Sequence, residues 1–148
     1  MIKLIRFIAA FLTYAIIDIV WHLFPFVTAM YVNLREASGL GNEWSFGKEM
    51  DTWGGFEFLA LLVFFLLMGL ANSHLAIEPA LRENSLRKAM LNSFILGCAA
   101  YATYSVPIFV MIAKWPVPLV PIDIIIGGCL SLATSTIVTA VALRMRKS

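Results

Sequence analysis

The sequence predicts an all-α integral membrane protein, and three observations lead to this class. Hydrophobic residues make up 61% of the 148 residues, and charged residues only 14%. The mean hydropathy of +0.87 exceeds what soluble domains tolerate, because water would meet too much apolar surface. Four apolar stretches, each near the roughly 20 residues that a spanning helix needs, take up nearly all of the chain. We therefore predict a single bundle of four transmembrane helices over residues 1–148.

The first predicted helix covers residues 4–26. Lys3 and Arg6 precede its apolar run, an arrangement that signal peptides share. The run is about 20 residues long and contains Asp18 and His22, so we expect a retained helix and no cleaved signal.

An outer loop rich in Gly and Trp is predicted over residues 33–55, between helices one and two. Its charged residues favour a position outside the hydrocarbon core of the membrane. The loop contains the amphipathic side chain of Trp44 and the apolar side chain of Phe46. We therefore expect part of the loop to lie on the membrane surface, where a short interfacial helix could form.

The second helix is predicted over residues 56–77, with Glu78 and Pro79 closing it. Its apolar run is the densest of the chain. A charged connector that contains Arg82, Glu83, Arg87 and Lys88 separates it from the third helix.

The third helix is predicted over residues 90–112 and contains Pro107. A membrane helix tolerates such a proline when neighbouring groups satisfy the freed carbonyl, so we expect a kink near Tyr104 and no chain reversal. The fourth helix is predicted over residues 119–143, with Pro121 in its first turn, where proline is harmless.

The distribution of basic residues predicts the orientation, because Lys and Arg near helix ends are retained in the cytoplasm. Four crossings place both termini on one side of the membrane. That side holds Lys3, Arg6, Arg82, Arg87, Lys88, Arg144, Arg146 and Lys147, and the other side holds Arg35, Lys48 and Lys114. We therefore expect a multi-pass protein of the bacterial inner membrane with both termini in the cytoplasm.

All four tryptophans are expected on the outer side: Trp21, Trp44, Trp53 and Trp115. Amphipathic indole rings anchor membrane proteins at the headgroup level without any ligand. Trp44, Trp53 and Trp115 are therefore predicted to be interface anchors.

Polar side chains are predicted to converge in the outer leaflet. An ionisable group at the centre of a membrane helix costs about 2.5 to 3.5 kcal/mol, so each one is a candidate for function. At a rise of about 1.5 Å per residue, four helices bring such groups to similar depth. The predicted intramembrane pocket consists of Asp18, Trp21, His22, Glu57, Tyr101, Tyr104, Ser105 and Asp123.

Two interpretations of this pocket remain open. In the first, Asp18 and Asp123 bind a proton, a cation or a lipid headgroup, with His22 as a proton partner. In the second, both carboxylates accept hydrogen bonds from neighbouring helices and so stabilise the bundle. Such bonds matter because the hydrophobic effect does not drive helices to associate within lipid.

A stripe of small residues follows Asp123 at every fourth position: Gly127, Ser131, Ser135 and Thr139. Small residues on one helix face let a second backbone approach closely. This stripe is therefore predicted to be a helix-packing surface.

Several function classes are excluded or disfavoured. A net charge of +2, with basic residues only at segment ends, does not favour nucleic acid. Asp18, His22 and Asp123 have no metal-binding spacing, and His22 and His74 lie too far apart in depth to share a haem iron. No nucleophile motif or phosphate-binding loop is present. We therefore predict no catalytic residue, metal or cofactor.

Four features carry a resemblance to a known family: the pair Asp18-x-x-Trp21, the run Ala100–Tyr104, the pair Trp115-Pro116, and Asp123. In order and spacing the chain resembles the small bacterial membrane proteins catalogued as domain of unknown function 2177. The resemblance implies a four-helix inner-membrane protein whose activity is unassigned.

The chain departs from the family pattern at two places. An Asp and a nearby Asn follow the tyrosine run in the family, whereas Ser105 to Ile108 stand here, and the family's Trp-Gly is Ile126-Gly127. If those positions carry an activity, this chain has lost part of it, which favours an accessory role.

We therefore expect a non-enzymatic accessory or assembly subunit of a larger inner-membrane complex, which docks through helix faces and the outer loop. Its expected partners are membrane lipids and other membrane subunits or a second copy. The alternative is an outer-leaflet lipid-handling enzyme or a small proton-coupled transporter that uses the Asp/His/Tyr pocket.

Overall fold

A computed structural model describes residues 3–40 and 54–146, and this part of the chain is helical without any strand. The elements are α1 (Lys3–Leu23), α2 (Pro25–Ala37), α3 (Gly55–Ala71), the π-helix η3 (Asn72–Ile77), α4 (Glu78–Arg82), α5 (Leu86–Met111) and α6 (Leu119–Met145). Four helical stretches are long and apolar enough to cross a membrane. Three of them are α1, α5 and α6, and the remaining one is the continuous helix formed by α3, η3 and α4. The predicted class of multi-pass helical membrane protein is confirmed.

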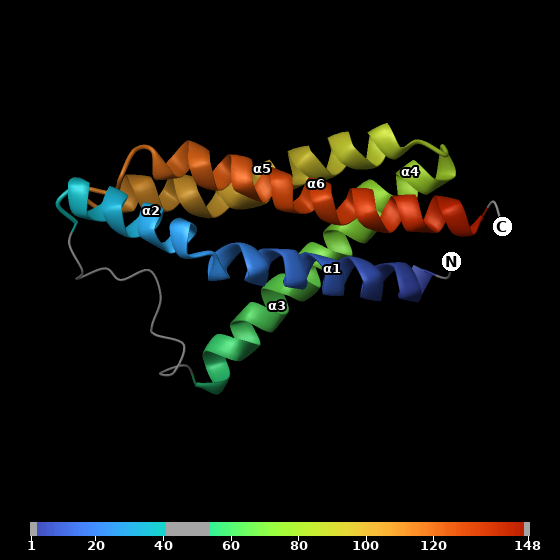
Figure 1. Cartoon of the computed structure of the whole chain (residues 1–148), viewed down its shortest axis with the longest axis horizontal. Helices are drawn as coiled ribbons and strands as arrows, with labels where there is room; N and C mark the ends of the chain where they lie inside the picture. The colour runs from blue at the N-terminus through green and yellow to red at the C-terminus, as the bar shows by residue number, and fades with distance from the viewer. Residues whose placement is uncertain (1–2, 41–53, 147–148) are drawn as a thin grey trace.

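The helices α5 and α6 lie side by side in opposite directions, and α1 and α2 follow one another along α6 (Figure 1). The helix α3 crosses α1, and its N-terminal half points away from α5 and α6 (Figure 1). Both termini lie at one end of the bundle, which we call the termini end. The opposite end, which holds α2 and the turn between α5 and α6, is the loop end.

Glycines allow the closest helix contacts. A Cβ atom added at Gly97 of α5 would lie 2.1 Å from the carbonyl oxygen of Gly127 in α6. A Cβ atom at Gly69 of α3 would lie 2.7 Å from the Cα atom of Phe11 in α1. Backbones at this separation leave no room for a side chain, as in other small-residue interfaces of membrane helices.

The first helix ends earlier than the predicted residue 26, and a second helix follows where a loop was expected. Proline has no N–H group, so Pro25 cannot bond to the carbonyl of Trp21, and Phe24 donates to that carbonyl instead at 3.2 Å. Phe24 is extended, and Pro25 then begins α2, a position that suits its fixed φ angle. Because α2 continues to Ala37, the loop predicted from residue 33 begins later. The predicted anchors Trp44 and Trp53 lie outside the described residues.

The second span passes through Pro79, where the sequence predicts its end. Proline leaves the carbonyl four residues earlier, that of Leu75, without its helical donor. Asn92 of α5 supplies a replacement, because its side-chain amide donates to the Leu75 oxygen at 3.0 Å. The preceding π-helix closes with a bond from the Glu78 N–H to the Ser73 oxygen. The helix therefore ends at Arg82 and not at residue 77.

The third and fourth spans are longer than predicted. The helix α5 begins at Leu86, ahead of the expected residue 90, because the Ser85 hydroxyl caps it by accepting from the Lys88 N–H at 3.3 Å. Pro107 lies within α5, and the helix continues past it to Met111. The helix α6 extends to Met145.

Candidate functional site

Asp123 lies at the loop end, where hydroxyl groups from α2 and α5 surround it. Its side chain is 1% exposed. One carboxylate oxygen accepts a hydrogen bond from the phenol of Tyr31. The other accepts from Tyr104 and Ser105, each at 3.4 Å. Three elements therefore meet at one buried carboxylate.

Asp18 is the second buried carboxylate, at 5% exposure. The phenol of Tyr101 donates to one of its oxygens at 3.0 Å. His22, one turn further along α1, has Nδ1 3.6 Å from the other oxygen and 2.8 Å from the Asp18 carbonyl. The His22 side chain is 56% exposed, so it connects a buried acid to the surface of the bundle.

The two carboxylates belong to one site, which we call the acidic site. His22 is close enough to interact electrostatically with both Asp18 and Asp123. Tyr31 likewise interacts with both carboxylates. The break between α1 and α2 produces this arrangement, because it redirects the chain so that Tyr31 reaches α6.

The acidic site has hydroxyl partners and one imidazole. Within the described part of the chain, no Lys or Arg side chain pairs with Asp18 or Asp123. Burial raises the pKa of the Tyr31 phenol above its ordinary value, so this group stays protonated and remains a donor. Two carboxylates without a permanent cation are costly in an apolar medium, and a proton or a bound cation lowers that cost.

The structure brings seven of the eight predicted pocket residues into this site or beside it. Trp21 belongs to the apolar cluster that also holds Tyr14 and Tyr101, and its ring lies edge-on to Phe26 with 5.8 Å between centroids. Glu57 is the exception. It lies in the first turn of α3, which diverges from the bundle, and accepts from the Gly54 N–H at 3.0 Å (Figure 1).

Sequence reasoning missed Tyr31 as a site residue. It lies 92 positions from Asp123, in a segment expected between helix one and a loop. The available signal was Pro25, which favours the first turn of a helix as well as the end of one. Tyr14 was predicted on the same inward face of the first helix as Asp18 but not as a pocket residue, and it is fully buried beside Tyr101 and Ser131.

The small-residue stripe of α6 is buried inside this chain. Its four members are Gly127, Ser131, Ser135 and Thr139. The Ser135 hydroxyl donates to the side-chain oxygen of Asn72 in η3 at 2.9 Å. The stripe therefore packs against the chain's own helices. Trp115 is also buried, against Leu40 and Leu119, and does not lie on the surface as an interface anchor.

Within residues 3–40 and 54–146, no three His, Cys, Asp or Glu side chains converge as a metal site would require. The acidic site offers two carboxylates and one imidazole, of which only Asp18 and His22 form a close pair.

A family model described as "Predicted membrane protein (DUF2177)" matches residues 3–140. The chain belongs to this family. The resemblance drawn from the sequence is thereby confirmed, and the matched range contains the whole acidic site. No curated protein and no solved structure matches the chain.

In this member of the DUF2177 family, hydrogen bonds and packing connect the features that carried the resemblance, from Asp18 on α1 to the turn at the loop end. Asp18 bonds to Tyr101, and Asp123 bonds to Tyr104, so the first and last features each contact the tyrosine run. Trp115 packs against the first turn of α6, near Asp123. Residues that are more than a hundred positions apart in the sequence are thus brought together by the fold.

Proposed function

We propose that the acidic site binds and releases a proton or a small cation, and that the chain is a small proton- or cation-coupled membrane protein. One observation carries this proposal: Asp18 and Asp123 are buried together without a Lys or Arg partner in the described part of the chain. A purely structural carboxylate in a membrane is most stable opposite a permanent cation, because the charge is then compensated.

The surroundings of the site support exchange with the exterior. His22 contacts Asp18 while its own side chain is more than half exposed, so an imidazole links the buried acid to the surface of the bundle. The hydroxyls of Tyr31, Tyr104 and Ser105 are able to accept as well as donate, so they tolerate either charge state of Asp123.

The test is to titrate the purified protein in mild detergent and to follow the carboxylic acid C=O band by infrared difference spectroscopy. Asp18→Asn and Asp123→Asn are each expected to remove part of a band that changes with pH, while the protein stays folded. Glu57→Gln is the matched control, because Glu57 lies outside the acidic site, and it should leave that part of the band intact. Adding Na⁺ or K⁺ distinguishes a cation from a proton, since a bound cation suppresses protonation.

Two results would contradict the proposal. One is a carboxyl band that does not change with pH in the wild-type protein. The other is failure of both Asn variants to accumulate while Glu57→Gln accumulates normally, which would make the carboxylates structural locks.

A second candidate function is a non-enzymatic accessory or assembly subunit of a larger membrane complex. The N-terminal half of α3 favours it, because this segment separates from α5 and α6 and exposes large apolar side chains on several faces (Figure 1). The stripe of α6 is buried within the chain, so α3 replaces it as the proposed docking surface.

This candidate predicts that the untagged protein, extracted gently from its native membrane, travels in a particle much larger than itself with a stoichiometric partner. A second copy of the chain is the other proposed partner. Consistent recovery of a lone monomer would contradict both. We further propose the bacterial inner membrane as the location, with the termini end in the cytoplasm.

A further inference from the structure

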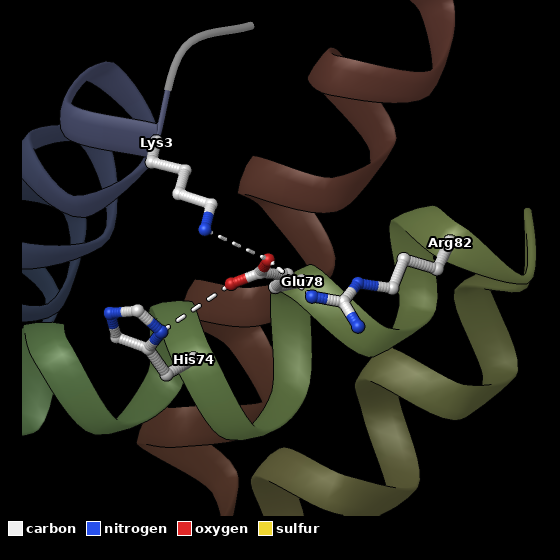
Figure 2. A network of polar contacts seen from close by, with 4 residues as sticks. All are labelled: Lys3, His74, Glu78 and Arg82. Atoms are coloured by element: carbon white, nitrogen blue, oxygen red, sulfur yellow. Dashed lines mark hydrogen bonds and ion pairs between the residues drawn. The ribbon is translucent and has the colours of Figure 1, made fainter.

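A group of charged side chains at the termini end has no place in the acidic site. Figure 2 shows Glu78 of α4 between Lys3 of α1, His74 of η3 and Arg82 of α4. The Glu78 carboxylate lies 2.7 Å from Arg82, 3.4 Å from His74 and 3.8 Å from Lys3. Its side chain is 13% exposed, whereas Lys3 and Arg82 are 72% and 74% exposed.

This group carries more positive charge than its own carboxylate compensates. Arg6, one turn after Lys3 on α1, also interacts electrostatically with Glu78. Three permanent cations therefore lie near one acid, so two positive charges are left over without counting His74. The Nε atom of Arg6 is buried and finds no hydrogen-bond partner among the described residues.

Two other basic side chains at the same end, Lys88 and Arg146, are already engaged. Lys88 pairs with Glu83, and Arg146 donates to the Leu81 carbonyl at 2.6 Å. The group of Lys3, Arg6 and Arg82 differs because cations from two helices converge, and Lys3 and Arg82 remain largely exposed. A general excess of basic residues at a membrane surface requires no such convergence.

The position of the group fits a lipid phosphate. Lys3 begins α1 and Arg82 ends α4, so both lie at the ends of candidate membrane spans, at the level of headgroups. Guanidinium groups bind phosphate oxygens with charge-assisted hydrogen bonds. Leu4 and Leu75, the sequence neighbours of Lys3 and His74, are exposed and apolar, which suits contact with acyl chains.

We propose that Lys3, Arg6 and Arg82 bind the phosphate of an anionic phospholipid in the leaflet at the termini end. Basic pockets between membrane helices recognise such headgroups by charge. This site is separate from the acidic site and independent of the proposed function, because Asp18 lies 15 residues beyond Lys3 on α1 and Asp123 lies at the opposite end of the bundle.

The test is to titrate the detergent-purified protein with phosphatidylglycerol and, in parallel, with phosphatidylcholine, and to count bound lipids by native mass spectrometry. Wild type is expected to prefer phosphatidylglycerol. Arg6→Ala and Arg82→Ala are each expected to weaken that binding about tenfold, the size of one charge-assisted hydrogen bond. Arg87→Ala removes the same charge at the same end outside the group, and its binding should equal that of wild type.

A gain of binding offers a second, independent readout. Glu78→Gln removes the acid within the group but keeps its shape, so phosphatidylglycerol should bind more tightly. If the group were only a clasp between α1 and α4, this variant would lose stability and gain no affinity. Lys3→Ala serves if an arginine variant fails to fold, because Lys3 contacts Glu78 only at 3.8 Å.

Three outcomes would overturn the proposal. Equal loss in Arg87→Ala and Arg82→Ala would show a general charge effect. Displacement of phosphatidylglycerol by an equal concentration of inorganic phosphate would show a site for free anions. Equal binding of the two lipids by wild type would show no headgroup recognition. The infrared titration of the acidic site should be unchanged in every variant, which separates the two proposals.

Discussion

Gly97→Ala is expected to prevent the protein from accumulating in a folded form. The added Cβ atom would lie 2.1 Å from the carbonyl oxygen and 2.6 Å from the carbonyl carbon of Gly127. Both are backbone atoms, so no rotamer change relieves the clash and α5 must move away from α6. Overpacking a tight interior costs about 1–3 kcal/mol when side chains alone adjust, and a backbone clash belongs at or above the top of that range.

The measurement is the yield of monodisperse protein after extraction in mild detergent, together with its thermal unfolding midpoint. Gly55→Ala is the matched control, because nothing lies within 4 Å of a Cβ atom there and alanine favours the helix. A Gly97→Ala protein as stable as the control would mean that α5 and α6 are not held at this separation.

Asn92→Leu is expected to destabilise the second span, and Pro79→Ala should rescue it. Asn92 supplies the hydrogen bond that Pro79 removes from the Leu75 carbonyl. Without Asn92 that carbonyl has no donor, which costs about 1–3 kcal/mol where water does not replace it. Alanine at position 79 restores a backbone N–H, so the double variant should recover most of the loss.

The measurement is the free energy of unfolding for wild type, both single variants and the double variant in one detergent titration. Pro79→Ala alone should change stability little, because Asn92 already satisfies the carbonyl. A coupling energy near zero between Asn92→Leu and Pro79→Ala would contradict this explanation. Asn92 would then not be the reason that the helix continues through Pro79.

The length of the hydrophobic runs explains why the four spans were predictable. A helix in lipid satisfies its own backbone, so the length and composition of a segment decide whether it spans. The helix ends were less predictable, and two of them differ from the prediction because of a proline. Pro25 and Pro79 both free a carbonyl, but a local N–H from Phe24 satisfies the first and a distant side chain, Asn92, satisfies the second. Pro25 therefore ends α1, whereas the second span continues through Pro79.

The candidate site was predictable in part. Asp18 and His22 share a face because they are four residues apart on one helix, and that spacing is visible in the sequence. Asp123 and the tyrosine run were expected at similar depth. Depth alone does not decide which hydroxyl meets which carboxylate, so the pairs Asp18 with Tyr101 and Asp123 with Tyr104 came from the structure.

The sequence by itself determined the membrane class, the number of spans, the family and the presence of buried acids, because each depends on composition, spacing or motif. The tertiary structure alone decided that a second helix, α2, begins at Pro25, that Tyr31 reaches Asp123, and that Glu57 stays apart from both acids. These outcomes depend on how helices cross. Helix crossing follows from close backbone contacts such as that of Gly97 with Gly127, between positions 30 residues apart.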